Sequence, residues 1–228
     1  MIQKYIYIFL LTSLFASSNI YINNTNYLNV QNSDISTVDI NLIIGSINFK
    51  KTDINNNIYT NINIEQSFSS TKNIGAPNLP TFNSLIEIPR NADIQIEIIN
   101  QQSTEYNLSD YNINQLIQPI QRPISKSAPK GSAELIINDK IYNSDNYFSN
   151  NLISINKKGL LRGVEIANII INPIEYNPVQ NKIIVHHTLE FRLHFINADF
   201  DLMNNSKQQN FSPYFEPIFK TALSNYDS

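Results

Sequence analysis

The amino-acid sequence predicts an all-β fold, an antiparallel β-sandwich or open barrel with a short C-terminal helix. Three observations lead to this fold class. Segments with an apolar residue at every second position recur along the 228 residues, and this is the period of a half-buried strand. Turn-forming stretches separate these segments at regular intervals. Only the last residues of the chain show a helical period.

The first predicted strands cover residues 40–49, 58–68, 85–88 and 94–98. Gly45 lies inside the first apolar run, so we expect that run to be one continuous strand. Shorter strands are expected at residues 135–137 and 152–155. Together these segments supply enough alternating apolar positions for one β domain.

The most regular pattern covers residues 164–195. Residues 164–171 are mostly β-branched and predict a well-buried strand. From residue 183 to residue 195 apolar and polar side chains alternate, which predicts a strand with a core face and a wet face. Pro173 and Pro178 cannot donate to a ladder, so we expect a pair of strands joined by a rigid loop.

Two proline-rich stretches predict irregular loops. Residues 75–80 read GAPNLP, which neither a helix nor a central strand accepts. Residues 118–132 read QPIQRPISKSAPKGS, and their prolines predict an exposed loop.

The two ends of the chain differ from this β region, which we place at residues 36–205. Lys4, a short apolar run and small residues predict a signal peptide over residues 1–18 that is cleaved at Ser18. The protein is therefore expected to be exported to the periplasm, the cell surface or the medium, with no stable membrane anchor. Residues 19–35 are polar and are expected to be loose. Residues 206–228 are expected to form a linker with a helix that begins near Pro217.

Composition argues against several functional classes. The chain contains no Cys, which excludes thiol catalysis and thiolate metal sites. Its net charge of −3 and scattered basic residues do not suit a nucleic-acid partner. His187 follows the apolar register, while His186 and His194 share the wet face about 27 Å apart, too far for one metal ion. We expect no metal, no cofactor and no catalytic centre, so this chain alone is not an enzyme.

Four groups of residues form a recognisable series. They are a G-x-P-x-L-P motif (Gly75, Pro77, Leu79, Pro80) with the strand after it, an aromatic segment (Tyr142 and residues 146–148), an R-G pair (Arg162, Gly163) and a P-x-x-Y-N-P motif (Pro173, Tyr176, Asn177, Pro178). In this order they resemble the gingipain-type propeptide, the N-terminal prodomain of family C25 cysteine peptidases. Residues 211–226 are similar to the segment that joins such a prodomain to its catalytic domain.

The resemblance implies a β-sandwich that covers the active-site cleft of a caspase-like C25 catalytic domain, keeps the precursor latent and assists its folding. That catalytic domain is the expected partner, in cis if this chain is a fragment of a longer precursor and in trans otherwise. The resemblance also implies that a loop following a proline presents a basic residue to the S1 pocket of the peptidase. Lys126 matches this position, with Arg122 and Lys130 as alternatives.

Two other functions stay open on the sequence. Some relatives of this family serve type IX secretion as cell-surface processing components, so the chain could be the N-terminal domain of one. A generic exported β-sandwich that binds a carbohydrate or acts as an adhesin is the other alternative. In the prodomain, the P-x-x-Y-N-P motif is interpreted as loop rigidity rather than as a reactive centre.

Overall fold

The computed structural model describes residues 18–226 apart from 124, 126 and 128–133. Its strands form three sheets, and every paired strand is antiparallel to its neighbour. The first sheet contains β1 (Ser18–Tyr21), β4 (Ser46–Ile54) and β5 (Asn57–Asn63). The second contains β6 (Ser69–Ser70), β7 (Pro80–Ile88), β10 (Val164–Ile171) and β9 (Ile153–Leu161).

The third sheet contains β11 (Ile174–Asn177), β12 (Lys182–Ile196), β3 (Thr37–Ile43) and β2 (Tyr27–Asp34). Strand β8 (Asp93–Asn107) pairs with β12 along its length. The helical segments are a 3-10 turn (Leu108–Tyr111), α1 (Asp139–Tyr142), α2 (Phe200–Gln209) and α3 (Glu216–Ala222).

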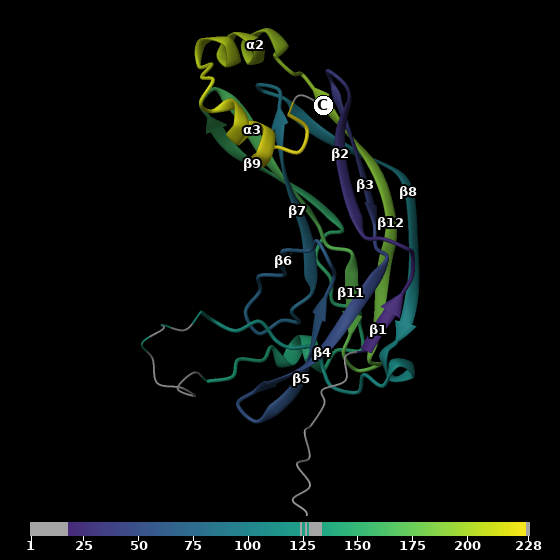
Figure 1. The fold of residues 1–228 in the computed structure, drawn as a ribbon. Helices are drawn as coiled ribbons and strands as arrows, with labels where there is room; N and C mark the ends of the chain where they lie inside the picture. Colours follow the sequence, from purple (N-terminus) through teal and green to yellow (C-terminus); the bar gives the residue numbers. More distant parts are fainter. Residues whose placement is uncertain (1–17, 124, 126, 128–133, 227–228) are drawn as a thin grey trace, which may run out of the picture.

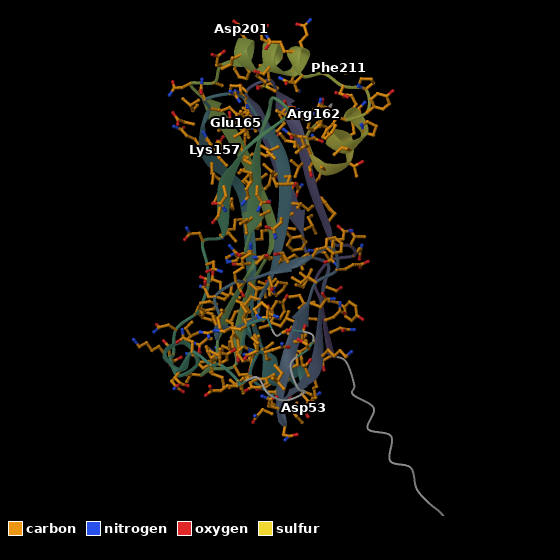
Figure 2. The ribbon with its side chains drawn as sticks, turned by 90° about the vertical axis from the view of Figure 1, so that its left-hand side faces the viewer. Asp53, Lys157, Arg162, Glu165, Asp201 and Phe211 are labelled. Atoms are coloured by element: carbon orange, nitrogen blue, oxygen red, sulfur yellow. The ribbon has the colours of Figure 1, made fainter. Side chains whose placement is uncertain are left out.

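The molecule is elongated, with the two helices α2 and α3 at one end (Figure 1). The segments that enter and leave the loop at residues 118–132 project from the other half of the molecule (Figure 1). In the view turned by 90°, Arg162 and Phe211 lie near the helical end, and Asp53 lies at the opposite end (Figure 2).

One continuous core joins the sheets, and this confirms the predicted antiparallel β-sandwich. Fully buried side chains of β3, β7 and β12 belong to the same apolar cluster, for example Ile40, Phe82 and Phe191. The alternation expected for residues 183–195 is present in β12, where Leu189, Phe191 and Leu193 are buried and the residues between them are half-exposed. Burial on every second residue is what fixes the register of such a strand.

The alternation of β12 is interrupted at the histidines, where our expectation was wrong. His187 has no partner in β8, because the register shifts between His186 and Thr188. This β-bulge leaves His187 half-buried rather than in the core. His186, which we expected on the wet face, is 7% exposed and lies 2.8 Å from Glu175 through its Nε2 atom.

Residues 40–49 do not form the single strand that we expected. The chain leaves β3 at Ile43 and enters another sheet at Ser46. Asn26 holds this crossing, since its Oδ1 atom accepts hydrogen bonds from the amides of Gly45 (2.6 Å) and Ser46 (3.2 Å). The apolar run is continuous because both strands contribute to one core, so hydrophobicity alone does not reveal the break.

Residues 19–35 are not loose, contrary to our expectation. Strand β1 pairs with β4, and β2 pairs with β3. Two apolar residues of this segment, Ile20 (1% exposed) and Val30 (8%), are buried, whereas Tyr21 (77%) and Ile35 (69%) are exposed. Both β1 and β2 are edge strands, each with one neighbouring strand. Edge strands tolerate polar side chains, so the polar sequence of this segment did not reveal them.

The proposed pairing of residues 164–171 with 183–195 is also corrected. Strand β10 pairs with β7 and β9, while β12 belongs to the third sheet. The four residues between Pro173 and Pro178 form β11, which pairs with β12. The prolines border this short strand, as their missing N–H groups require.

Two further segments differ from expectation. Residues 135–137 are irregular rather than a strand. Helix α3 confirms the predicted helix at Pro217, but α2 was not expected, and its first residues fall inside the region that we assigned to strands. Asp199 caps α2, since its side chain accepts a hydrogen bond from the Leu202 amide. The predicted signal peptide lies outside the described residues, except for Ser18.

Within the part of the chain that the structure describes, no helix is both long and apolar enough to cross a membrane.

Candidate functional site

The basic residues predicted to enter a peptidase pocket belong to the proline-rich loop predicted at residues 118–132, and Gln121 and Ile136 pair across its base. Lys126 and Lys130 lie outside the described residues. Arg122 is described and exposed, and Pro123 follows it. The structure therefore shows how the base of this loop is held. Three of the four motifs identified in the sequence, all but the R-G pair, supply residues that hold it.

The segment that enters the loop is extended and is bound on one side by β5. The amide of Thr60 donates to the Leu116 carbonyl, and the amide of Gln118 donates to the Thr60 carbonyl, both at 2.8 Å. The pairing between Thr60 and Ile117 is parallel. Residues 116–118 thus pair with β5 through one isolated parallel bridge.

The same segment is bound on its other side by the G-x-P-x-L-P motif. The Gly75 amide donates to the Ile120 carbonyl at 2.8 Å, and the Ile120 amide donates to the Ala76 carbonyl at 2.9 Å. The Asn78 amide donates to the Gln118 carbonyl at 2.8 Å. Three backbone hydrogen bonds therefore join the motif to the entering segment.

Gly75 also binds the segment that leaves the loop. Its carbonyl accepts from the Asn138 amide at 2.9 Å. Gly75 has φ +80°, and a Cβ atom there would lie 3.0 Å from the Asn138 nitrogen and 3.3 Å from Cγ2 of Ile136. A residue with a side chain would be strained in its backbone and would press on the departing segment, which is why glycine is required.

Gln121 closes the base of the loop between its two ends. Its Nε2 atom donates to the Ile136 carbonyl and its Oε1 atom accepts from the Ile136 amide, both at 2.9 Å. The side-chain amide thus pairs with Ile136 as a strand backbone would. We name this arrangement of Gly75, Ala76, Asn78, Gln121 and Ile136 around the base of the loop the socket.

The remaining motif residues fix the shape of the socket. The Thr71 hydroxyl donates to the Pro77 carbonyl at 2.8 Å and accepts from the Leu79 amide at 3.1 Å. Leu79 is 1% exposed and packs into the main core, and Pro80 begins β7. These contacts join the motif to the sandwich.

Two tyrosines bind the base of the loop from the core. The Tyr142 hydroxyl donates to the Ile117 carbonyl at 2.6 Å, and the Ile117 amide donates to the Tyr176 hydroxyl at 3.4 Å. Burial raises the pKa of Tyr142 and raises that of Tyr176 to about 12, so both phenols stay neutral over the physiological range. The aromatic segment and the P-x-x-Y-N-P motif therefore meet at Ile117.

Asn177 and Pro178 form the turn beside Tyr176. The Asn177 Oδ1 atom accepts from the amides of Val179 (3.1 Å) and Gln180 (3.0 Å), while its Nδ2 atom donates to Asp145 at 2.9 Å. Hydrogen bonds from Asn177 and then from Gln180 lower the pKa of Asp145. The Asn177 side chain therefore holds this turn through three hydrogen bonds.

The R-G pair lies far from the loop and contacts the C-terminal helices instead. Arg162 and Gly163 form the turn between β9 and β10 at the helical end. Gly163 has φ +84°, and a Cβ atom there would lie 2.7 Å from the Ser206 carbonyl oxygen of α2. The Arg162 guanidinium lies 4.6 Å from the centre of the Phe215 ring. The pair therefore supports the C-terminal helices, not the loop.

A polar groove of about 500 Å³ lies on the second sheet beside the socket. It includes Thr71 of the socket region and the ammonium groups of Lys72 and Lys158, and no carboxylate is among its lining residues. Most of the others are Asn, Ser or Thr from β6, β7, β9 and β10. The groove thus presents hydrogen-bonding groups and a net positive charge.

The described residues contain no group of three His, Asp or Glu side chains that could hold a metal ion. His186 and His194 each bind one glutamate, at 2.8 Å in both cases. Burial lowers the pKa of His187, and the neighbouring His186 lowers it further. These histidines take part in strand contacts.

Sequence reasoning found the motif residues but not their shared target. Gln121 of the socket was not predicted, nor were Thr71 and Asn138, which bond to the motif beside it. In the sequence, nothing but their nearness to a proline-rich stretch indicated a role for these residues. Their hydrogen-bond partners lie up to 63 residues away in the chain, as Gly75 does from Asn138. Such pairings are visible only in three dimensions.

Comparison with known proteins identifies the family that the sequence motifs resemble. A family model for the C25 propeptide, Propeptide_C25, matches residues 21–226. Lys-gingipain of Porphyromonas gingivalis is 26% identical over 189 residues, and Lys-gingipain W83 of the same organism matches equally. The aligned region covers 83% of this chain, which spans 11% of the length of these relatives.

Two solved structures resemble the fold. One, which concerns the zymogenic latency of gingipain K from Porphyromonas gingivalis, has a TM-score of 0.74 at 23% identity and covers 80% of this chain and 100% of that one. The other is a complex of the pro- and mature domains of RgpB from the same organism. Its TM-score is 0.68 at 17% identity, with 88% of this chain and 98% of that chain covered.

Proposed function

Because the chain belongs to the C25 propeptide family over residues 21–226, we propose that it is the latency-keeping prodomain of a C25 cysteine-type endopeptidase precursor. In this role it covers the active-site cleft of a caspase-like catalytic domain and assists the folding of that domain. The chain contributes no catalytic residue of its own. The observation that carries the proposal is the socket, where motifs from distant parts of the sequence bind the base of one projecting loop.

The relatives support this role. One solved neighbour is a prodomain bound to its mature domain, and the other was determined to explain zymogen latency. The polar groove beside the socket supports binding of the catalytic domain on this side of the molecule. Its lining contains two lysines and no carboxylate, which suits a partner that presents carbonyl and carboxylate acceptors.

Within the loop, Lys126 is the residue proposed to enter the S1 pocket, with Arg122 and Lys130 as alternatives. An ammonium group on a long stem reaches an acidic pocket while its methylene groups contact the walls. The socket supports binding through this loop, because a loop whose base is fixed loses less conformational freedom when it binds.

The chain is proposed to be exported to the periplasm, the cell surface or the medium, and to lose residues 1–18. Cleavage at Ser18 agrees with the fold, since it removes only the first residue of β1, the partner of Phe49. We also propose a larger folded unit than the sequence indicated. It extends from β1 to Tyr226, because the N-terminal strands and the C-terminal helices pack on the same sandwich.

The proposal is tested by adding the purified chain, residues 19–228, to the catalytic domain of its own precursor and following hydrolysis of a fluorogenic peptide. The parent chain is expected to inhibit. Lys126→Ala is expected to weaken inhibition by about 30-fold or more, since truncating one partner of a buried charge pair costs about 2–5 kcal/mol.

Arg122→Ala and Lys130→Ala identify which basic residue of the loop acts, and Lys50→Ala on β4 is the matched control for loss of a surface charge. If Arg122→Ala or Lys130→Ala alone abolishes inhibition, the assignment of Lys126 is wrong. If the parent chain does not inhibit at all, the proposed function is wrong.

A further inference from the structure

The last described residues, 210–226, fold back onto the sandwich at the helical end. We name them the tail. Their last buried polar residue is Asn225, which is 4% exposed. The socket does not involve the tail, and the two lie in different parts of the molecule (Figure 1).

The side chain of Asn225 binds β7 as a neighbouring strand would. Its Oδ1 atom accepts from the Glu87 amide at 2.8 Å, and its Nδ2 atom donates to the Glu87 carbonyl at 3.0 Å. One residue earlier, the Ser224 amide donates to the Leu85 carbonyl at 2.9 Å. The tail thus adds a short hydrogen-bonded segment to β7.

Asn225 also binds β2, which belongs to another sheet. Its Nδ2 atom donates to the Asn32 side-chain oxygen at 3.0 Å, and the Asn32 Nδ2 atom donates to the Asn225 carbonyl at 2.9 Å. A single amide therefore joins the tail to two sheets of the sandwich.

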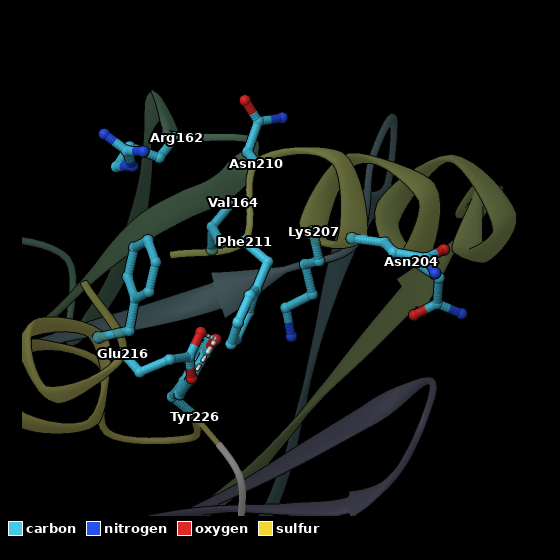
Figure 3. A pocket seen from close by; sticks show the side chains of 10 residues that line it. Arg162, Val164, Asn204, Lys207, Asn210, Phe211, Glu216 and Tyr226 are labelled. Atoms are coloured by element: carbon cyan, nitrogen blue, oxygen red, sulfur yellow. Dashed lines mark hydrogen bonds between the residues drawn. The ribbon is translucent and has the colours of Figure 1, made fainter. Parts of the chain in front are cut away.

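Apolar and charged contacts hold the rest of the tail. Phe219 and Leu223 form a small core with Val164 that is separate from the main core. The centre of the Tyr226 ring lies 5.3 Å from that of the Phe219 ring. The Lys207 ammonium lies 4.7 Å from the centre of the Tyr226 ring, and both of these residues are labelled in Figure 3. A second, small core allows this end to open while the sandwich stays folded.

Lys207 links this region to β7 as well. Its ammonium donates to Oε2 of Glu87 at 2.7 Å, and the Glu87 side chain is 6% exposed. The Tyr226 hydroxyl donates to Glu216 of α3 (Figure 3). Glu87 is therefore bound by Asn225 through its backbone and by Lys207 through its carboxylate.

We propose that the tail is a latch, with Asn225 as its positioning residue, that fixes the direction in which the polypeptide leaves the sandwich toward the peptidase. This inference rests on the proposed function. A fixed exit holds the covalently joined catalytic domain where the loop reaches it, so loop binding becomes intramolecular at high effective concentration. If the tail opened, the loop would stay intact, but its binding would no longer gain from a high effective concentration.

The first experiment is amide hydrogen exchange of the whole chain, comparing the parent with Asn225→Ala. The substitution removes three side-chain hydrogen bonds that close the tail. We expect the amide of Ser224 to exchange about tenfold faster or more, with β12 unchanged. Asn210→Ala is the matched control, because within the described residues the side chain of that tail asparagine bonds Ser206 of the preceding helical turn and no residue of β2 or β7.

Asn32→Ala removes part of the same contact from the other side and serves if Asn225→Ala does not fold. It is expected to speed exchange at Ser224 in the same direction. Unchanged exchange at Ser224 in both variants would overturn the latch.

The second experiment compares inhibition within one polypeptide and between separate chains. Asn225→Ala is expected to raise the basal activity of the joined precursor about tenfold. The same variant, added as a separate chain, should inhibit the free catalytic domain within twofold of the parent. This difference would not arise if Asn225 merely supported the fold.

The outcomes separate the two proposals. If Asn225→Ala weakens inhibition equally in both arrangements, or in neither, the latch is wrong. If the parent chain fails to inhibit in either arrangement, the proposed function is wrong, and with it the role of the tail.

Discussion

At the scale of single residues, Ile117 shows how the base of the loop is positioned. It is fully buried, and its carbonyl and amide are each bound by a phenol, from Tyr142 and Tyr176. A buried backbone group without a partner is costly, so these two side chains act where no strand is available.

A prediction follows for Tyr142→Phe. The variant leaves the Ile117 carbonyl without its buried donor, so the free energy of unfolding should fall by about 1–3 kcal/mol at neutral pH. Urea unfolding measures this change, and Tyr21→Phe, at a tyrosine that is 77% exposed, is the control. Equal stability of the two variants would contradict the role of the hydroxyl.

The same variant has a predicted pH dependence. The pKa of Tyr142 is raised by burial, whereas an unfolded tyrosine ionises near pH 10. Above that pH the unfolded state releases a proton that the folded state keeps, so the parent loses stability as pH rises. Tyr142→Phe should lose less stability between pH 10 and pH 12, although Tyr176 still contributes in that range.

The sequence allowed some residues to be assigned and not others. The faces of β12 followed from alternation, because burial on every second position is a local signal. The bulge at His187 did not, since it depends on the pairing of β8 with β12. The socket partners of Gly75 were hidden for the same reason.

At the scale of elements, the loop depends on a glycine that touches both of its ends. Gly75→Ala places a methyl group 3.0 Å from the Asn138 nitrogen at φ +80°. Gly159 also has a positive φ (+107°), but nothing lies within 4 Å of its added Cβ atom. Comparing alanine substitutions at Gly75 and Gly159 therefore separates the effect of backbone strain, which both share, from the effect of contact with the segment that leaves the loop.

We predict that both alanine variants lose stability through strain, by about 1–3 kcal/mol each. Only Gly75→Ala should also increase cleavage within the loop by a trypsin-like protease in limited proteolysis, because only it disturbs the socket. Equal cleavage of the two variants would show that Gly75 does not hold the loop.

Element types were predicted better than their connections. Strands at β10 and β12 and the helix at Pro217 follow from local periodicity. The break at Gly45 and the partners of β10 depend on which sheet each strand joins, and local periodicity contains no such information. Helix α2 lacks a buried face, so its sequence has no clear apolar stripe.

At the scale of the whole molecule, one large core and one small core predict two levels of stability. The sandwich should unfold in a single transition, because its three sheets share a continuous core. The tail, which packs on the small core, should open at lower denaturant concentration. Hydrogen exchange at increasing urea, compared with circular dichroism, measures both, and coincident midpoints would contradict this separation.

The socket has a consequence for how this fold can change. Its hydrogen bonds to the base of the loop use backbone atoms of the motif and the Gln121 side chain, none of which lies between residues 122 and 135. Because loop length adds little to the cost of closure, we expect that stretch to accept a segment of different sequence and length. A foreign segment grafted between Gln121 and Ile136 is therefore expected to be held by the same scaffold, with no change to the scaffold's own sequence.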